Sequence, residues 1–347
     1  MLIKPDNPYL QYSGRIDRTD ALAPVLVYPC SYIKMKFTGT YVKAVVENRK
    51  SYWSSFLGFF IDGEQKCVKL AESGKETITL ADGLDNTEHE LMLFKRMDSC
   101  HTFTFYGFEV DDEAILCEVG PKPASRIEVY VDSVSAGDVS EAVDYVGQPD
   151  PVHDGEYSNS YYSYTWMTAR NLNAEIHDIA QGGAALLDGT GWFAGPDYVG
   201  MESIYDKIQY YPEPAQPSKW DFQLYRPHVV IVAIGQNDAN PEDYMAEDYE
   251  GDKAQRWRKA YREFVLNLRT IYPKATIILA TTILEHDANW DRAIDEVCRE
   301  LADERIHRFL YSNNGVGTPG HIRIPEAEQM AQELTTFIES LGEEIWE

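Results

Sequence analysis

The sequence predicts two domains, an all-β domain of sandwich or jelly-roll type followed by an α/β/α three-layer domain with a mostly parallel sheet. Three observations predict this fold class. The 347 residues exceed the usual size of a single core. The first third shows period-two apolar alternation, and the rest alternates strand-like with helical segments. Residues 119–123 (Val-Gly-Pro-Lys-Pro) are typical of a linker, so we expect the domains at residues 1–120 and 121–347.

In the expected β-domain, polar and apolar residues alternate at Lys34–Phe37 and His101–Phe105, as they do in half-buried strands. Glycine-containing pairs mark turns between such strands, at residues 38–39, 62–63, 73–74 and 82–83. No convincing amphipathic helix precedes residue 138. Many short strands at regular spacing favour a sandwich or a jelly roll.

In the expected α/β domain, the run His228–Ile234 is almost continuously apolar, which is typical of a parallel strand buried on both faces. Further strands are expected at residues 127–131, 175–179, 275–281 and 306–311, and helices at residues 160–172, 253–271, 291–303 and 325–341. Long loops at residues 144–159 and 188–220 leave the carboxyl ends of strands, where such sheets bind ligands. The second loop contains aromatic residues that suit a binding role, namely Trp192, Phe193, Tyr198, Tyr210 and Tyr211.

The charge, the apolar stretches and the cysteines of the sequence exclude several classes of function. The formal net charge of −26 disfavours nucleic acid and anionic membranes as partners and is compatible with a neutral substrate. Residues 1–8 have no apolar core of signal-peptide length, and no stretch is apolar for long enough to span a bilayer, so we expect a cytoplasmic protein. The five cysteines have no Cys-x-x-Cys spacing, so we expect reduced thiols and no metal site.

Four short fragments, each after an expected strand, carry the chemistry. They are residues 131–133 (Val-Asp-Ser), 180–183 (Ala-Gln-Gly-Gly), 235–238 (Gly-Gln-Asn-Asp) and 320–321 (Gly-His). A serine hydroxyl needs a base before it becomes a good nucleophile, and the oxyanion that it creates needs preset N–H donors. Ser133, a glycine at 182 or 183 and Asn237 have such donors. With His321 as the base, the pattern predicts an acyl-transfer site.

Each fragment taken alone also fits a structural role. Asp-Ser after a strand is commonly a helix cap, Gly-Gly and Asn-Asp are common turn residues, and a histidine near a chain end is commonly exposed. The joint occurrence of all four, in the order that the site needs, favours the catalytic interpretation.

On these residues the C-terminal two-thirds resembles the SGNH (GDSL-type) hydrolases, in which a Ser, a Gly, an Asn and a His come from four sequence blocks. Ser133 matches the first block, although Val131 replaces its leading glycine. Asn237 matches the third block and His321 the fourth. The second block is matched by Gly183 or, alternatively, by Gly182.

The N-terminal third is similar to carbohydrate esterase family 2. The similarity is carried by residues 28–31 (Tyr-Pro-Cys-Ser), 37–40 (Phe-Thr-Gly-Thr), 60–63 (Phe-Ile-Asp-Gly) and 106–108 (Tyr-Gly-Phe). This resemblance implies a jelly-roll domain joined to an SGNH domain. It also implies removal of acetyl groups from plant polysaccharides and oligosaccharides.

One position departs from the SGNH pattern. These proteins commonly carry Asp three residues before the histidine, where this chain has Thr318. Some relatives are understood to use a Ser–His dyad in which a backbone carbonyl holds the imidazole. By the resemblance we expect a dyad of Ser133 and His321, with the carbonyl of Thr318 or Pro319 accepting from His321 Nδ1. The alternative is a carboxylate from elsewhere, the nearest candidates being Asp287 and Glu285.

We therefore expect a carbohydrate O-acetyl esterase that acts on acetylated manno- or xylo-oligosaccharides through an acyl-enzyme, without metal or organic cofactor. Trp192 and Trp290 are candidates for stacking on a sugar ring, although Trp290 fits a core position equally well. Asp132 is expected to support the turn behind Ser133, and Asp238 is also assigned a supporting role. Two rivals remain: a carbohydrate-binding protein whose SGNH domain is catalytically weakened, and a lipid or thioester hydrolase.

Overall fold

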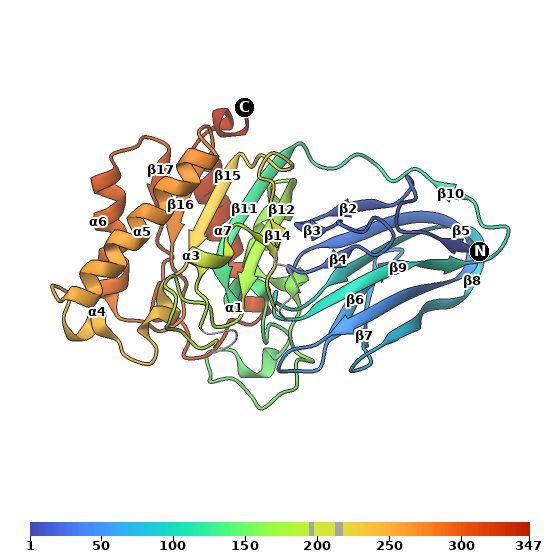
Figure 1. Ribbon diagram of the computed structural model, residues 1–347, viewed down its shortest axis with the longest axis horizontal. Coiled ribbons are helices and arrows are strands. Elements are labelled where there is room, and N and C mark those ends of the chain that lie inside the picture. The colour runs from blue at the N-terminus through green and yellow to red at the C-terminus, as the bar shows by residue number, and fades with distance from the viewer. Residues whose placement is uncertain (194–197, 212–217) are drawn as a thin grey trace.

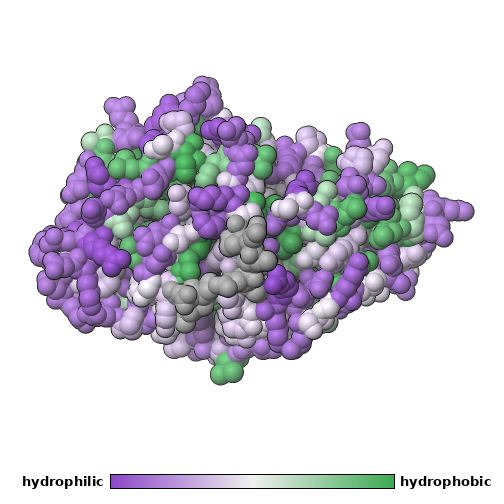
Figure 2. Space-filling model, viewed as in Figure 1, coloured by the Kyte–Doolittle hydropathy of each residue, from purple (hydrophilic) through white to green (hydrophobic). Residues whose placement is uncertain are grey.

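The computed structural model describes residues 1–193, 198–211 and 218–347. An antiparallel β-domain and an α/β domain lie next to each other along the long axis of the molecule (Figure 1). The face seen in Figure 2 is largely hydrophilic over both domains, in keeping with the net charge of −26. The fold class predicted from the sequence is confirmed.

The β-domain is a curved antiparallel sheet. Its strands are β1 (Leu2–Ile3), β2 (Gln11–Ser13), β3 (Ile16–Asp17), β4 (Val25–Leu26), β5 (Tyr32–Arg49), β6 (Phe56–Ile61), β7 (Glu64–Lys69), β8 (Lys75–Lys95), β9 (Thr102–Val110) and β10 (Leu116–Cys117). Most follow the order β3-β4-β9-β5-β8-β6-β7, while β1 pairs with β9 and both β2 and β10 pair with β5. Register shifts bend the long β5–β8 pair, so the sheet wraps around its own apolar core.

The α/β domain has a parallel sheet. In spatial order its strands are β12 (Ala174–Gln181), β11 (Ser125–Asp132), β15 (Val229–Ala233), β16 (Thr276–Ala280) and β17 (Ile306–Arg308). The predicted domain boundary falls between β10 and β11. The chain moves to one side of β11 to form β12 and then to the other side to form β15. Such a reversal opens a crevice at the carboxyl end of β11, directly before Ser133.

Helices cover both faces of this sheet. They are α1 (Ser133–Ala136), α2 (Tyr164–Asn171), α3 (Met201–Ile204), α4 (Tyr244–Glu247), α5 (Asp252–Ile271), α6 (Ala288–Leu301) and α7 (Ile324–Ser340). α5 and α6 bury their apolar sides in one core cluster, and α2 and α7 bury theirs in a second cluster on the opposite face. Within the described ranges, none combines the length and apolar character needed to cross a membrane.

The remaining elements are short. They are the hairpin β13 (Lys207–Gln209) and β14 (Ser218–Lys219) and the 3₁₀ turns η1 (Val143–Tyr145), η2 (Ser160–Tyr162), η3 (Gln236–Ala239) and η4 (Glu343–Trp346). The helix expected over residues 160–172 is divided into η2 and α2. The division falls at Ser163, whose side chain accepts from the backbone N–H of Trp166 and so begins a new helix.

A buried ion pair joins the two domains. Arg15 comes shortly after β2 in the chain. Its guanidinium lies 2.7 Å from the carboxylate of Glu128 in β11, and both side chains are completely buried. Arg15 also donates to the carbonyls of Tyr205 and Lys207. Because removing one partner would leave a buried charge unpaired, these contacts fix how the β-domain sits against the sheet that carries Ser133.

Candidate active site

Ser133 is the first residue of α1, immediately after β11. Asp132 is the N-cap, and its Oδ1 accepts from the Val134 N–H at 3.1 Å. Its other oxygen accepts from Asn237 Nδ2 at 2.9 Å and from Gln236 Nε2 at 2.8 Å. Burial raises the pKa of Asp132 to about 6. The Asp132 carboxyl therefore links the turn that carries Ser133 to the turn that carries Asn237. This is the supporting role that the sequence predicted for Asp132.

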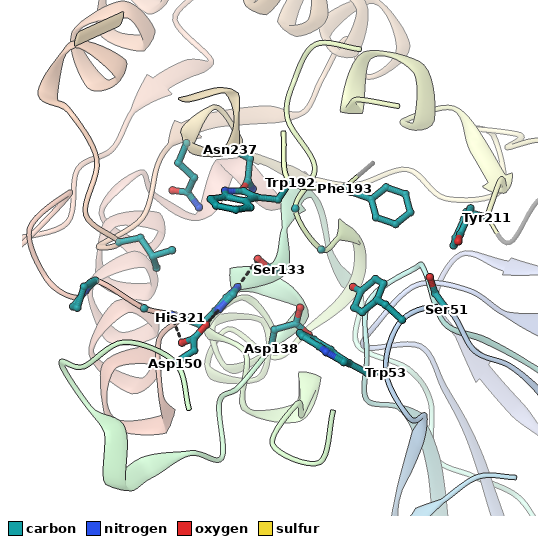
Figure 3. A pocket seen from close by; sticks show the side chains of 17 residues that line it. Ser51, Trp53, Ser133, Asp138, Asp150, Trp192, Phe193, Tyr211, Asn237 and His321 are labelled. Atoms are coloured by element: carbon teal, nitrogen blue, oxygen red, sulfur yellow. Dashed lines mark hydrogen bonds and ion pairs between the residues drawn. The ribbon is translucent and has the colours of Figure 1, made fainter. Parts of the chain in front are cut away.

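His321 lies beside Ser133. Its Nε2 is 2.7 Å from Ser133 Oγ, and its Nδ1 is 2.5 Å from Asp150 Oδ2 (Figure 3). The His321 backbone N–H also donates to Asp150 Oδ1 at 2.9 Å. Burial alone would lower the pKa of His321, but the hydrogen bond and charge of Asp150 outweigh burial and raise it. Serine, histidine and carboxylate thus form a continuous hydrogen-bonded triad.

The expected dyad is therefore wrong in one respect, the partner of His321 Nδ1. The carbonyl of Thr318 is already occupied, because it accepts from the backbone N–H of Glu285 at 2.9 Å. Asp287 caps α6 by accepting from the Asn289 N–H at 2.8 Å. In the described part of the chain, no hydrogen bond joins Glu285 or Asp287 to His321. Asp150 supplies the carboxylate instead.

Asp150 reaches the histidine because its loop is anchored. The loop segment Gln148-Pro149-Asp150-Pro151 is stiffened by two prolines. The completely buried Arg323 has Nη1 3.1 Å from Asp150 Oδ1, and its Nη2 donates to the carbonyls of Gln148 and Pro149. Although burial opposes it, hydrogen bonding to His321 and Arg323 lowers the pKa of Asp150 far below its usual range. In the sequence, a carboxylate between two prolines is a signal for a rigidly held acidic side chain. The same loop contains other acidic residues, so this signal alone does not select Asp150 as the partner of His321.

The two glycines of the second fragment have different roles. The Gly182 N–H donates to Asp98 Oδ2 at 2.7 Å, so it is occupied. The Gly183 N–H makes no hydrogen bond to any described residue, and φ of +69° at Gly183 favours glycine. The second amide hydrogen of Asn237 Nδ2 and the N–H of Ser133 complete a candidate oxyanion hole. The geometry favours Gly183 over Gly182 as its donor.

The β-domain builds part of the site, which sequence reasoning missed. Asp98, from the connection between β8 and β9, holds the Gly182 N–H and also accepts from the Tyr52 hydroxyl. The neighbouring Ser99 N–H donates to the carbonyl of Ala180 at 3.1 Å. Asp154, in the loop that carries Asp150, accepts from the Ser54 hydroxyl at 2.6 Å. The β-domain therefore positions both the glycine turn and the Asp150 loop.

These groups surround a cleft of about 690 Å³ that both domains line (Figure 3). Its lining residues are Ser51, Tyr52, Trp53, Ser133, Asp138, Asp150, Gly182, Gly183, Trp192, Phe193, Tyr211, Gln236, Asn237, Leu284, Pro319, Gly320 and His321. Trp53 comes from the β-domain, whereas Trp192 is 71% exposed and comes from the loop after β12. Trp192 therefore lies where the sequence suggested, at the cleft. Of the loop 188–220, residues 194–197 and 212–217 lie outside the described residues.

Asp238 is completely buried and supports the fold. Its carboxyl accepts from the Leu186 N–H at 2.7 Å and from the Leu187 N–H at 3.2 Å. Burial raises its pKa to about 7. Asp238 therefore ties the Asn237 turn to the chain that follows the glycine turn.

Trp290 does not line the cleft, so its assignment as a sugar-stacking residue is wrong. It is completely buried at the start of α6. Its Nε1 donates to Asp243 Oδ1 at 3.0 Å, and its ring packs edge-on against Trp257. The ring packs in the apolar core between α5 and α6. Trp290 is therefore a core residue, which is the alternative that the sequence allowed.

We expect Trp290→Ala to lower the free energy of unfolding by about 3–5 kcal/mol, because it leaves a large cavity in a packed core. Urea-induced unfolding followed by circular dichroism measures the change. The KM of the folded variant should stay near the wild-type value, since the side chain lies outside the cleft. A stable variant with a raised KM would contradict the core assignment.

The described residues contain no group of three or more His, Cys, Asp or Glu side chains placed to hold a metal ion. The nucleophile, the base and the oxyanion donors of the candidate site are side chains and backbone N–H groups of the protein itself.

The arrangement of Ser133, Gly183, Asn237 and His321 on this sheet defines an SGNH-type hydrolase domain, joined to an N-terminal β-domain. The chain resembles carbohydrate esterase family 2 over both domains. Residues 12–119 match the carbohydrate esterase 2 N-terminal model. The resemblance to this family that the sequence predicted is confirmed.

Whole-chain relatives agree with this resemblance. The chain is 28% identical to the cellulase/esterase CelE of Acetivibrio thermocellus, over 96% of this chain and 40% of CelE. It is 26% identical to an acetylxylan esterase/glucomannan deacetylase of Cellvibrio japonicus, over 96% of this chain and 89% of that protein. A solved family two carbohydrate esterase from Clostridium thermocellum, in complex with cellohexaose, has a TM-score of 0.79 at 24% identity. That alignment covers 96% of this chain and 98% of the other.

Proposed function

We propose that the protein is a carbohydrate O-acetyl esterase that removes acetyl groups from oligosaccharides, with manno- and xylo-oligosaccharides as the expected substrates. The observation that carries the proposal is the chain of hydrogen bonds from Ser133 through His321 to Asp150 at the base of an aromatic-lined cleft. The names of the Cellvibrio and Acetivibrio relatives support it. The cytoplasmic location expected from the sequence stays a prediction.

Each group of the candidate site has a role in one step of ester hydrolysis. His321 Nε2 takes the proton of Ser133 Oγ as the oxygen attacks the acetyl carbonyl. The N–H groups of Ser133 and Gly183 and the Asn237 amide stabilise the oxyanion. His321 then gives its proton to the departing sugar oxygen, which leaves an acetylated Ser133. A water molecule, deprotonated by His321, releases acetate and restores the serine.

The lining of the cleft supports a sugar ester over a long acyl chain. Its aromatic walls suit the apolar faces of sugar rings, while hydroxyl, amide and carboxyl groups lie between them. Asp150 fills the place that Thr318 leaves open. This carboxylate supports a working hydrolase over a weakened one that only binds carbohydrate.

The test is acetate release from acetylated manno- and xylo-oligosaccharides, compared with nitrophenyl esters of increasing acyl length. We expect acetate release from the oligosaccharides and a steep loss of activity beyond short acyl chains. A preference for long acyl chains would favour the lipid or thioester hydrolase. Binding of the oligosaccharides without acetate release, and without labelling of Ser133 by a serine-directed phosphonate, would favour a binding protein.

The pH dependence follows from His321. The imidazole must be neutral to accept the serine proton, and Asp150 raises its pKa above the ordinary value of 6.5. We therefore expect kcat/KM to be high at alkaline pH and to fall as the pH decreases through a value above 6.5. A pH profile with an acid limb centred below 6.5 would contradict the role given to Asp150.

A further inference from the structure

A second cleft lies between the two domains, where β2 and β3 of the β-domain meet β12 and the β13–β14 hairpin (Figure 1). Its volume is about 710 Å³, similar to that of the catalytic cleft. Glu175 lines it at the start of β12, whereas Gly182 follows the end of this strand, about 20 Å away. The mechanism proposed for Ser133 uses no residue of this second cleft, which is therefore a separate candidate site.

The second cleft is positively charged, although the chain has a net charge of −26. Four basic side chains line it, against two acidic ones that already have partners. Glu175 pairs with Lys122 at 2.5 Å, and Asp17 accepts from the Thr19 hydroxyl at 2.7 Å. The other basic residues form no ion pair with any described residue, and they are Arg18, Arg126 and Arg226. A group of unpaired arginines in so acidic a chain favours an anionic ligand.

Two of these arginines are held in place by the protein. Arg126 is half-buried in β11, and its Nε donates to the carbonyl of Arg226 at 2.6 Å. Neither terminal nitrogen of Arg126 forms a hydrogen bond to a described residue. The Arg18 guanidinium lies over the Tyr12 ring, 4.0 Å from its centroid. A planar guanidinium with unused N–H groups suits a carboxylate, which accepts two parallel hydrogen bonds from it.

The floor of the second cleft is aromatic. The His177 ring stacks on the Tyr225 ring with centroids 3.5 Å apart, and the Trp220 ring lies edge-on to His177. His177 Nδ1 and Trp220 Nε1 have no hydrogen-bond partner among the described residues, although both side chains are more than nine-tenths buried. Because buried polar groups are nearly always hydrogen-bonded, two unpaired ones in one floor favour a site that a ligand or its water completes.

The walls of the second cleft offer both apolar and polar contacts. Leu224 is 70% exposed and lines the cleft together with Tyr12. The side chains of Thr19 and Gln223 also line it, and both can hydrogen-bond hydroxyl groups. A ring with one apolar face, several hydroxyl groups and a carboxylate would use the walls and the arginines together. A uronic acid, which is a sugar that carries a carboxylate, has all three features.

We propose that this interdomain cleft binds a uronic acid residue of an oligosaccharide without changing it chemically. The choice of a sugar rests on the proposed esterase function, whereas the need for an anion rests on the arginines alone. Binding here would hold an acidic polysaccharide on the protein while Ser133 removes acetyl groups from other parts of the same chain.

The test uses isothermal titration calorimetry with three molecules that carry no acetyl ester. They are a xylo-oligosaccharide with one glucuronic acid side group, the same oligosaccharide without it, and glucose 6-phosphate. Wild-type protein should bind the acidic oligosaccharide at least about tenfold more tightly than the neutral one at low ionic strength, which is the effect of one charged hydrogen-bonded pair. The preference should decrease as salt is added, because salt screens the arginines.

Variants assign the preference to this cleft. Arg126→Gln and Arg18→Gln should each reduce it at least about threefold. Arg126→Lys should keep part of it, since a lysine retains the charge but lacks the planar pair of N–H groups. Arg262→Gln is the matched control, because Arg262 is an exposed arginine of α5 outside both clefts. Its preference should equal that of wild type. All four variants should hydrolyse nitrophenyl acetate with the wild-type kcat/KM.

The outcomes separate this proposal from the esterase function. Equal affinity of wild-type protein for the acidic and neutral oligosaccharides, or an unchanged preference in both glutamine variants, would overturn the second site and leave the esterase function standing. Tighter binding of glucose 6-phosphate would overturn the assignment to a uronic acid in favour of a phosphate. A preference that depends on Arg126, in a protein that releases no acetate from any oligosaccharide, would support the second site while the proposed function fails. The comparison on wild-type protein needs no variant, so a misfolded variant cannot block the test.

Discussion

Ser133→Ala is expected to reduce acetate release by about 10⁵-fold or more, because the variant has no nucleophile for His321 to activate. Binding of an acetylated oligosaccharide, measured by calorimetry, should stay within about tenfold of wild type, since the cleft walls are unchanged. The same variant should not react with a serine-directed phosphonate. Residual turnover at a tenth of the wild-type rate would show that another group attacks the ester.

Asp150→Asn is the second variant with a large expected effect. Asp150 Oδ1 accepts from the His321 backbone N–H and lies 3.1 Å from Arg323, so an amide oxygen would take that position. The amide nitrogen would then face His321 Nδ1 and stabilise the tautomer that carries its proton on Nε2. That tautomer cannot accept the proton of Ser133, so kcat/KM should fall by about 10³-fold to 10⁴-fold.

The matched control is Asp144→Asn, which removes an exposed carboxylate from the same loop without touching the triad. Its kcat/KM should equal that of wild type. A fall of less than tenfold in Asp150→Asn would mean that the Ser133–His321 pair works without the carboxylate. In that case the dyad expected from the sequence would describe the chemistry after all.

The β-domain changes how the site is understood. In its absence the Gly182 N–H would lose its acceptor Asp98, and the Asp150 loop would lose its contact with Ser54. Trp53 would also be missing from one wall of the cleft. The two domains are therefore one functional unit, because the glycine turn and the carboxylate loop are both held in place by groups outside the α/β domain.

Local patterns were enough to predict much of this protein. Apolar runs such as His228–Ile234 predicted the buried strands, since a parallel strand covered on both faces needs apolar residues throughout. Ser133, Asn237 and His321 follow strands in a fixed order, and parallel strands bring their carboxyl ends to one edge. The expected strands differ from the observed ones by a few residues at their ends, where hydrogen bonding rather than composition decides the boundary.

The features of the site and the core that depend on contacts between distant segments became clear only from the tertiary structure. Asp150 is separated from His321 by 171 positions, and its selection over other loop carboxylates depends on the buried Arg323, which no periodicity reveals. The choice between Gly182 and Gly183 depends on Asp98 from the other domain. Trp290 lies in the core because α5 presents an apolar surface against which its ring packs. A sequence pattern reports the burial and local geometry of a residue, whereas the partner of a side chain is determined only when distant segments pack together.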